Sequence, residues 1–457
     1  MFDKLQKALL NSDTDPIAPH SLRSELFGHL NELLTAKSPD NSNFKVKKFL
    51  RENPVVVLNV DKSQSLCIWD LEKYNTKLEE AFSPPYFEKL FCNPIDSEIL
   101  SYRKNLKQFL SQIPKQFHFK FDAVENLKVG YGLVKRHKPG MPLRPILSGF
   151  QTLTSRAEGQ ILNFIQSLEK ECTFSINSTK LFKSKILELS KNVNFKTFEL
   201  VSFDCKSMYS NIDVKKAIKI LCDKMFIKFK TKDFFPIDPE CPKMSRRNFE
   251  SFLKQLLIDH NYFITNTGFY RQTQGLSMGS KLSPLLANLY VNDIENRILK
   301  QHFDSGDLLG YLRYADDSIL ITKKRRFNKI LKDFNSADPL LKWTHESMLD
   351  NKLKFFDTIV SIKDNELSLG HFEKQDDEKI SLDYKKSVAP LSYKNSVLCG
   401  AIHRARNACS SEFEFNNALT KIRKKFRANN FPEKVIDEKI HELVGRNFEK
   451  SDFRLAQ

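Results

Sequence analysis

The sequence lacks the features of secreted, membrane-spanning and repetitive proteins. Its 8 cysteines include no Cys-x-x-Cys pair, no secretory signal peptide follows Met1, and no apolar run is long enough to cross a membrane. It contains no internal repeat and no low-complexity segment. Cys399, His403 and Cys409 are three possible zinc ligands without a fourth, so we expect buried thiols there. We therefore expect an intracellular protein of a reducing compartment without a membrane partner.

Positive charge is what the sequence has in excess. The 73 Lys and Arg residues outnumber the 56 Asp and Glu residues, which gives a formal net charge of +17 and a pI near 9.3. This balance favours a polyanionic partner. Because neither end carries a basic amphipathic anchor, nucleic acid is a better candidate than a membrane surface. The 457 residues suffice for two to four domains or subdomains with a sizeable core.

Two apolar segments that carry aspartates suggest a metal site. Residues 311–321 read as a strand, a tight turn at Asp316 and Asp317, and a second strand. Residues 198–204 read as another strand, which stops on Asp204. Each acid alone could simply accept hydrogen bonds in a turn. If the strand ends converge, however, their carboxylates can serve two Mg²⁺ ions, the arrangement that polymerases and nucleases use for phosphoryl transfer.

A basic hairpin is predicted over residues 131–148, where Pro139-Gly140 between two apolar runs fits a type II turn. Its cationic or potentially cationic residues are Lys135, Arg136, His137, Lys138 and Arg144. Such a loop could be solvated, or it could bind a triphosphate or a nucleic-acid backbone. The acidic site downstream favours binding, and a helix from residue 154 to about 169 is expected to pack the hairpin onto the body.

Two further segments could contact a nucleotide. Tyr209 follows Asp204 by five residues, and its ring could lie under a sugar or pack in the core. The small-residue loop 274–280 leads into a helix, for which Ser283 is the predicted N-cap and Pro284 the first helical residue. Such a loop lets a base pair approach the backbone closely. It could equally be a tightly packed helix start, and the two are compatible.

The order of these motifs resembles that of reverse transcriptases. It runs from a basic hairpin through a Phe-Asp strand and a Ser-Pro-Leu-Leu-Ala-Asn helix to a Tyr-Ala-Asp-Asp hairpin. Details resemble the Penelope-like retroelement enzymes: Lys-Arg-His-Lys-Pro-Gly at 135–140, Leu-Arg-Pro-Ile at 143–146 and Met-Gly-Ser at 278–280. The likeness covers about residues 55–445. Downstream, Leu-Lys-Phe-Phe-Asp at 353–357 resembles the family's Phe-Leu-Asp segment.

The sequence departs from this family in two places. Ser63 follows Asp61-Lys62 where the family has glycine. The C-terminal nuclease motifs Gly-Ile-Tyr and Tyr-Ile-Gly of the longer members do not occur. The chain could thus belong to the nuclease-lacking branch associated with chromosome ends, or be a truncated chain or a host-adopted copy.

The resemblance implies an α+β right-hand polymerase. A mostly helical N-terminal extension would cover residues 1–115, the fingers and antiparallel-sheet palm 116–385, and a helical thumb 386–457. Asp204, Asp316 and Asp317 would be catalytic and hold two Mg²⁺ ions, with Mn²⁺ as the alternative ion. The expected nucleotide-binding residues are Lys135, Arg144, Tyr209 as a steric gate against a ribose 2′-oxygen, and Met278 and Gly279 beside the nascent base pair.

The thumb is expected to bind the duplex backbone. In residues 421–427, Ile422 and Phe426 lie four apart on one helix face with cations around them. Such a run is usually a solvated face, but in a thumb helix it would read the charge and shape of primer and template. The expected nucleic-acid-binding residues are Arg136, Lys138, Lys421, Arg423, Lys424 and Lys425.

The implied function is extension of a DNA primer, or of an RNA/DNA hybrid, with dNTPs on an RNA template. One alternative is an RNA-synthesising polymerase of the same fold, against which Tyr209 argues. Another is a non-catalytic nucleic-acid-binding scaffold, against which the three intact aspartates argue. The basic run 323–326 could be a nuclear import signal, which would fit a nuclear location, but its place directly after the aspartate hairpin favours palm surface.

Overall fold

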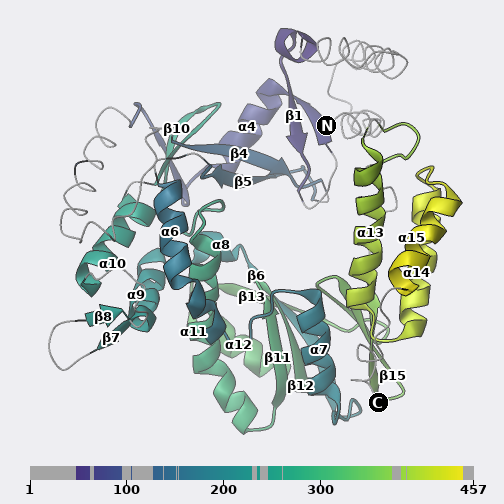
Figure 1. Cartoon of the computed structure of the whole chain (residues 1–457). Helices are drawn as coiled ribbons and strands as arrows, with labels where there is room; N and C mark the ends of the chain where they lie inside the picture. The colour runs from purple at the N-terminus through teal and green to yellow at the C-terminus, as the bar shows by residue number, and fades with distance from the viewer. Residues whose placement is uncertain are drawn as a thin grey trace.

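The architecture follows from a computed structural model, which describes residues 48–61, 66–94, 104, 127–136, 138–150, 152, 154–228, 234–236, 245–259, 261–372, 382–387 and 389–445. A central sheet with helices on both faces carries a second sheet at one end and a helical bundle at the other (Figure 1). These three parts are the palm, the fingers and the thumb. Among the described residues, no helix is both long and apolar enough to cross a membrane.

The palm is built on a four-stranded antiparallel sheet in the order β11-β12-β6-β13. Its strands are β6 (Phe198–Lys206), β11 (Leu308–Tyr314), β12 (Asp317–Lys323) and β13 (Lys342–Ser347). Side chains alternate between its two faces. Val201, Phe203 and Cys205 join the larger core, whereas Leu200 joins a second core on the opposite face.

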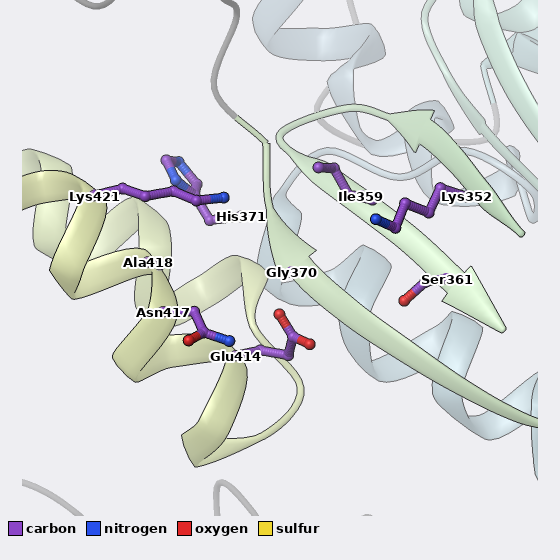
Figure 2. A pocket seen from close by; sticks show the side chains of 9 residues that line it. All are labelled: Lys352, Ile359, Ser361, Gly370, His371, Glu414, Asn417, Ala418 and Lys421. Carbon is purple, nitrogen blue, oxygen red and sulfur yellow. The ribbon is translucent and has the colours of Figure 1, made fainter. Parts of the chain in front are cut away.

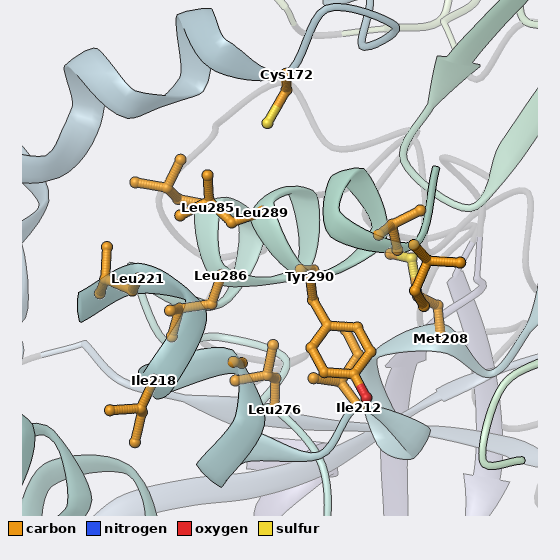
Figure 3. Packing of buried hydrophobic residues seen from close by; sticks show 14 of the residues in the cluster. Cys172, Met208, Ile212, Ile218, Leu221, Leu276, Leu285, Leu286, Leu289 and Tyr290 are labelled. Carbon is orange, nitrogen blue, oxygen red and sulfur yellow. The ribbon is translucent and has the colours of Figure 1, made fainter. Parts of the chain in front are cut away.

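Helices cover the first face of the palm sheet (Figure 3). They are α9 (Val214–Met225), α11 (Ser283–Asp304) and α12 (Phe327–Ala337), with the short α8 (Met208–Asn211) beside α11. Leu286 of α11 lies beside Ile218 and Leu221 of α9, and Tyr290 of α11 lies beside Ile212. α10 (Arg246–Lys254) and the following π-helical turn (Gln255–Asp259) complete this layer, and β7 (Phe226–Lys228) pairs with β8 (Phe234–Pro236) beside it.

The opposite face is covered by α7 (Thr179–Ser190) and a three-stranded sheet. That sheet comprises β14 (Lys352–Phe355), β15 (Thr358–Lys363) and β16 (Glu366–His371). Phe182 of α7 contacts Phe355 of β14, with ring centroids 4.9 Å apart. This second core ends short of Asp204 and Asp317, and the same face of the palm sheet therefore carries an apolar end and an acidic end.

The fingers contain a five-stranded sheet in the order β3-β10-β9-β4-β5. Its strands are β3 (Phe87–Leu90), β4 (Lys128–Val134), β5 (Leu143–Ser148), β9 (Tyr262–Thr265) and β10 (Gly268–Gln272). α4 (Leu71–Ala81) packs on one face through Tyr74 and Leu78. The predicted basic hairpin is β4–β5, and Gly140 has the positive φ of 70° that its turn requires. β1 (Val55–Asn59) and β2 (Leu66–Asp70) form an N-terminal hairpin.

The thumb is a bundle of α13 (Leu391–Ala408), α14 (Glu412–Arg427) and α15 (Glu433–Gly445). The Ser411 side chain caps α14 by accepting a hydrogen bond from the Glu414 N–H. Acidic residues in its first turn and basic ones in its last complement the helix dipole. Ile422 and Phe426 lie in the thumb core, as their spacing predicts.

Two sequence-based boundaries are corrected. α11 begins at Ser283, so its N-cap is Leu282 and not Ser283, whose hydroxyl donates to the Ser277 carbonyl instead. β6 continues to Lys206, so Asp204 lies inside the strand and not at its end, because β13 pairs with β6 as far as that residue. The predicted helix from 154 to 169 is α6 (Ser155–Ile165) followed by a 3₁₀ helix (Gln166–Glu171). His137 and Ser63 lie outside the described residues.

Candidate active site

The structure brings the three predicted acids together. Asp204 of β6 lies directly opposite Asp317 of β12, and such cross-strand partners project from the same face. The Cys205 N–H donates to the Asp316 carbonyl at 2.9 Å, which extends the ladder into the turn. Asp204 and Asp316 are half-buried and Asp317 is exposed. The acids lie where the β11–β12 turn adjoins β6, at one end of the inner strands; we call this end the acidic edge of the palm sheet. It presents three carboxylates from segments more than a hundred residues apart.

The hairpin turn places Asp316 and Asp317 differently. Tyr314 pairs with Asp317, so the loop consists of Ala315 and Asp316. Ala315 has a φ of 53°, a left-handed conformation that non-glycine residues rarely adopt. As a result Asp317 is the first strand residue and Asp316 stands in the turn itself. Tyr314 is fixed by Phe356, whose ring centroid lies 4.0 Å away.

A lysine lies beside the acids. The Lys206 ammonium contacts Asp204 Oδ2, and this hydrogen bond raises the pKa of Lys206. Within the described parts of the chain, no three His, Cys, Asp or Glu side chains form a ready-made metal cluster. An open carboxylate edge fits Mg²⁺, which keeps waters and is commonly completed by substrate phosphates. The residues present therefore fit a divalent ion that binds together with its substrate.

Tyr209 of α8 lies next to this edge. Its backbone carbonyl accepts a hydrogen bond from the Leu276 N–H at 2.7 Å, and its side chain is half-buried. Burial, together with the nearby negative charge of Asp316, raises the pKa of Tyr209. Gly275 packs so closely on α8 that a Cβ would lie 2.4 Å from the Ser210 carbonyl oxygen. The loop before α11 thus holds Tyr209 in place. The close packing of Gly275 on α8 contributes to this, and the position of Gly275 in the sequence does not reveal it.

Met278 and Gly279 lie against the fingers. The Leu147 N–H of β5 donates to the Met278 carbonyl at 3.0 Å. A Cβ on Gly279, at a φ of 138°, would lie only 1.8 Å from the Leu147 carbonyl oxygen. Ser280 Oγ donates to the buried Glu158 carboxylate at 2.7 Å. The tight-packing alternative for this loop is therefore correct, while Met278 and Gly279 are respectively half-buried and exposed.

The basic hairpin is tied to the N-terminal strand by an ion pair that sequence reasoning missed. Arg144 Nε donates to Asp61 Oδ2 at 3.1 Å. Asp61 is buried, and its N–H donates to the Val134 carbonyl at 2.8 Å. The signal available in the sequence was Asp61 itself, in the segment that matches the family only loosely. Arg136 and Lys138 are exposed and Lys135 is half-buried.

The predicted cations of the thumb divide into two kinds. Arg423 is paired with Asp437 of α15 at 3.0 Å, so its charge is partly neutralised. Lys421 and Lys424 are exposed and Lys425 is half-buried. Lys421 lines a pocket of about 160 Å³ between α14 and the β14–β16 sheet, where Lys352 and His371 also lie (Figure 2). This pocket lies between the thumb and the palm.

Comparison with known families gives two matches. Residues 137–362 match the family described as reverse transcriptase (RNA-dependent DNA polymerase). Residues 385–441, which include α13 and α14, match the family described as animal helix-turn-helix domain. None of the curated proteins compared matches the sequence.

Solved structures share the fold at low sequence identity. The telomerase from Candida albicans in complex with a TWJ fragment of telomeric RNA is 11% identical, with a TM-score of 0.55 over 96% of this chain and 73% of that one. The apo telomerase from Candida tropicalis is 14% identical, with a TM-score of 0.51 over 99% of this chain and 82% of that one. These likenesses confirm the expected right-hand polymerase fold. Residues 137–362 are a reverse transcriptase domain, and the chain is an RNA-directed DNA polymerase, a nucleotidyltransferase.

Proposed function

We propose that the protein extends a DNA primer with dNTPs on an RNA template at the edge formed by Asp204, Asp316 and Asp317. One observation supports this most strongly: Asp204 and Asp317 are direct cross-strand partners, and the Asp316 carbonyl continues the same ladder. An RNA/DNA hybrid would be bound as the product grows. The three carboxylates would hold two Mg²⁺ ions, or Mn²⁺ in their place, and would release Lys206 from Asp204.

When bound, the two ions supply activation of the primer 3′-hydroxyl and stabilisation of the leaving pyrophosphate. The protein's own groups position the reactants. Asp204 and Asp317 share a face of the sheet, so they would hold the ions over that face and orient the nucleotide phosphates there. Tyr209, held by Leu276, would stand beside the sugar of the incoming nucleotide and exclude a 2′-hydroxyl. Met278 and Gly279, fixed against Leu147, would lie beside the new base pair.

The cationic surfaces would bind phosphates. In the fingers, Arg144 and Lys135 would contact the triphosphate, while Arg136 and Lys138 would contact the nucleic-acid backbone. In the thumb, Lys421, Lys424 and Lys425 would contact the duplex, with Arg423 secondary because Asp437 neutralises it. The helix-turn-helix likeness of residues 385–441 supports nucleic-acid binding by this region.

We further propose that the enzyme belongs to the Penelope-like branch and acts in the nucleus, with a role at chromosome ends as one possibility for that branch. Support comes from the Lys-Arg-His-Lys-Pro-Gly and Met-Gly-Ser segments, which resemble those of that branch. Sequencing of the RNA and DNA that copurify with the protein from nuclei tests this. Telomeric repeats would support a role at chromosome ends, and element-derived transcripts alone would contradict it.

Primer extension tests the proposed reaction directly. With an RNA template, a DNA primer, dNTPs and Mg²⁺, wild-type protein should add nucleotides, and Asp316→Asn should abolish extension while leaving duplex binding largely intact. The matched control is Asp304→Asn, an exposed aspartate paired with Lys300 on α11. Equal extension by wild type and Asp316→Asn would refute the catalytic assignment. Extension with NTPs alone would instead support an RNA-synthesising polymerase.

A further inference from the structure

One fully buried cation lies directly under the aspartate turn. Arg313 of β11 is 0% exposed and is among the largest side chains that the core encloses completely. Its backbone is held on both sides, because its N–H donates to the Phe174 carbonyl and its own carbonyl accepts from Ile176 N–H, each at 2.8 Å. An arginine is almost never fully buried unless it is paired. Its hydrogen-bond partners therefore indicate which parts of the fold the Arg313 side chain connects.

All the hydrogen-bonding capacity of the Arg313 guanidinium is used. Nε donates to Glu295 Oε1 at 2.5 Å, and Nη2 donates to Glu295 Oε2 and to the Asn288 carbonyl, each at 3.4 Å. Nη1 donates to Asn288 Oδ1 at 2.9 Å and to the Ala315 carbonyl at 3.1 Å. A guanidinium has five N–H groups, and each one has an acceptor here. Four of the contacts go to α11 and the fifth goes to the turn.

The turn depends on contacts beyond the backbone pairing of β11 with β12. That pairing ends at Tyr314 and Asp317, so it leaves the carbonyls of Ala315 and Asp316 to other partners. The Asp316 carbonyl is taken by Cys205 N–H and the Ala315 carbonyl by Arg313. Ala315 itself adopts a left-handed φ of 53°, which persists only where surrounding contacts hold it. One contact fixes the turn to β6, and the other fixes it to α11.

We infer that Arg313 is a positioning residue for the reaction: through Ala315 it holds Asp316 and Asp317 in register with Asp204, and Glu295 and Asn288 hold Arg313. This inference rests on the proposed function, since it assigns a role toward the same three carboxylates. Arginine is needed because its planar fork spans α11 and the turn at once. A lysine could keep the charge pair with Glu295 but has a single nitrogen, and it could not also reach the turn.

A purely structural buried pair would behave differently. Replacing both members of a buried ion pair by apolar residues of similar volume often leaves stability unchanged or increases it. If Arg313 and Glu295 only fill the core, the double variant Arg313→Met/Glu295→Leu should keep both stability and activity. If Arg313 holds the turn, the double variant should stay folded and lose catalytic rate.

The test compares this double variant, Arg313→Lys and wild type in steady-state primer extension and thermal unfolding. We expect cooperative unfolding in both variants, an unchanged Kd for primer–template and a KM for dNTP within about twofold. We expect kcat to fall about 10- to 100-fold, the loss typical of an ångström-scale misplacement. The Mg²⁺ concentration for half-maximal activity should rise, since the carboxylates no longer share one fixed edge. Arg297→Lys is the matched control, an exposed arginine of α11 paired with Asp293.

Each outcome decides the inference. A folded Arg313→Lys or double variant with wild-type kcat and Mg²⁺ requirement would overturn it. If the double variant unfolds, Arg313→Lys, which keeps the buried charge, decides alone. If Arg313→Lys also unfolds, Asn288→Ala decides, because it removes one anchor of Arg313 and leaves the Glu295 pair. Asp316→Asn in the same assay separates the two claims: activity there would refute the proposed function, whatever the Arg313 variants show.

Discussion

Tyr209 illustrates how a single side chain is given a role by its neighbours. Its residue number places it five positions after Asp204, which does not distinguish a core aromatic from one that contacts a nucleotide. The structure holds its carbonyl through the Leu276 N–H and leaves its side chain half-buried. Burial, together with the nearby negative charge of Asp316, raises the pKa of Tyr209. A ring fixed in that place can discriminate between sugars by steric exclusion.

Removing the Tyr209 ring should therefore admit ribonucleotides. For Tyr209→Ala we expect the ratio of kcat/KM for dNTP to that for NTP to fall about 10- to 100-fold, comparable to other pockets that discriminate by shape alone. Single-nucleotide incorporation with each substrate measures this ratio. Tyr393→Ala, at an exposed thumb position, serves as control. A Tyr209→Ala enzyme that rejects NTPs as strongly as wild type would disprove the steric-gate assignment.

At the scale of elements, the N-terminal region of the chain takes part in the fingers. β3 forms the edge strand of the fingers sheet through β10, and Asp61, two residues after β1, pairs with Arg144 of β5. The bond is made by Arg144 Nε, so Asp61 orients the guanidinium from behind. The function of the N-terminal region could not be read from the sequence. Through Asp61 this region contacts Arg144, which is proposed to bind the triphosphate.

Loss of the Asp61 charge should weaken nucleotide binding. For Asp61→Asn we expect KM for dNTP to rise about 3- to 10-fold with kcat little changed, which is the size of one weakened charge-assisted hydrogen bond. Steady-state kinetics at saturating primer–template measures both constants. Glu72→Gln, at an exposed position of α4, is the control. An unchanged or lower KM would show that Asp61 does not orient Arg144 for binding.

Two neighbouring cations of the thumb helix α14, Lys424 and Arg423, are expected to contribute differently to duplex binding. Lys424 is exposed, whereas Arg423 is paired with Asp437. For Lys424→Gln we expect the slope of log K for duplex against log salt to fall by about 0.7–0.9, the contribution of one phosphate contact. Arg423→Gln should change the slope clearly less. Equal slopes for Lys424→Gln and wild type would place the duplex elsewhere.

For the whole molecule, burial of cysteines predicts a loss of stability at alkaline pH. Burial raises the pKa of Cys205 and Cys222 to about 12, and that of Cys172 and Cys409 to about 11. In the unfolded chain these thiols ionise near pH 8.5. Between about pH 9 and 11 the unfolded state therefore binds fewer protons, and each thiol lowers the free energy of unfolding by about 1.4 kcal/mol per pH unit.

Urea unfolding at pH 8, 9 and 10 measures this effect as a falling midpoint. Cys222→Ala should be less stable at pH 8 but show a shallower decline, because one ionising thiol is gone. Cys92→Ala, at an exposed position, should decline like wild type. A midpoint independent of pH between 8 and 10 would contradict the burial of these thiols.

Sequence and structure agree where the signal is local. The Asp316–Asp317 hairpin, the basic β4–β5 hairpin and the buried stripe of α14 follow from alternation, Pro-Gly chemistry and helical spacing. The partners of Arg313, Arg144 and Tyr209 could not be predicted, because each contact joins segments that only the tertiary fold brings together. The N-cap of α11 was misassigned because the Ser283 hydroxyl bonds to the preceding loop, which competes with capping.

We propose that Asp204, Asp316 and Asp317 together hold the divalent ions, and iron-mediated cleavage tests this. With Fe²⁺ in place of Mg²⁺, primer–template and dNTP bound, and ascorbate with peroxide added, hydroxyl radicals cut the backbone near the metal. We expect cuts close to residue 204 and close to residues 316–317 in the same protein, suppressed by excess Mg²⁺ and lost in Asp204→Asn. Cleavage at neither segment, or cleavage that Asp204→Asn leaves intact, would contradict it.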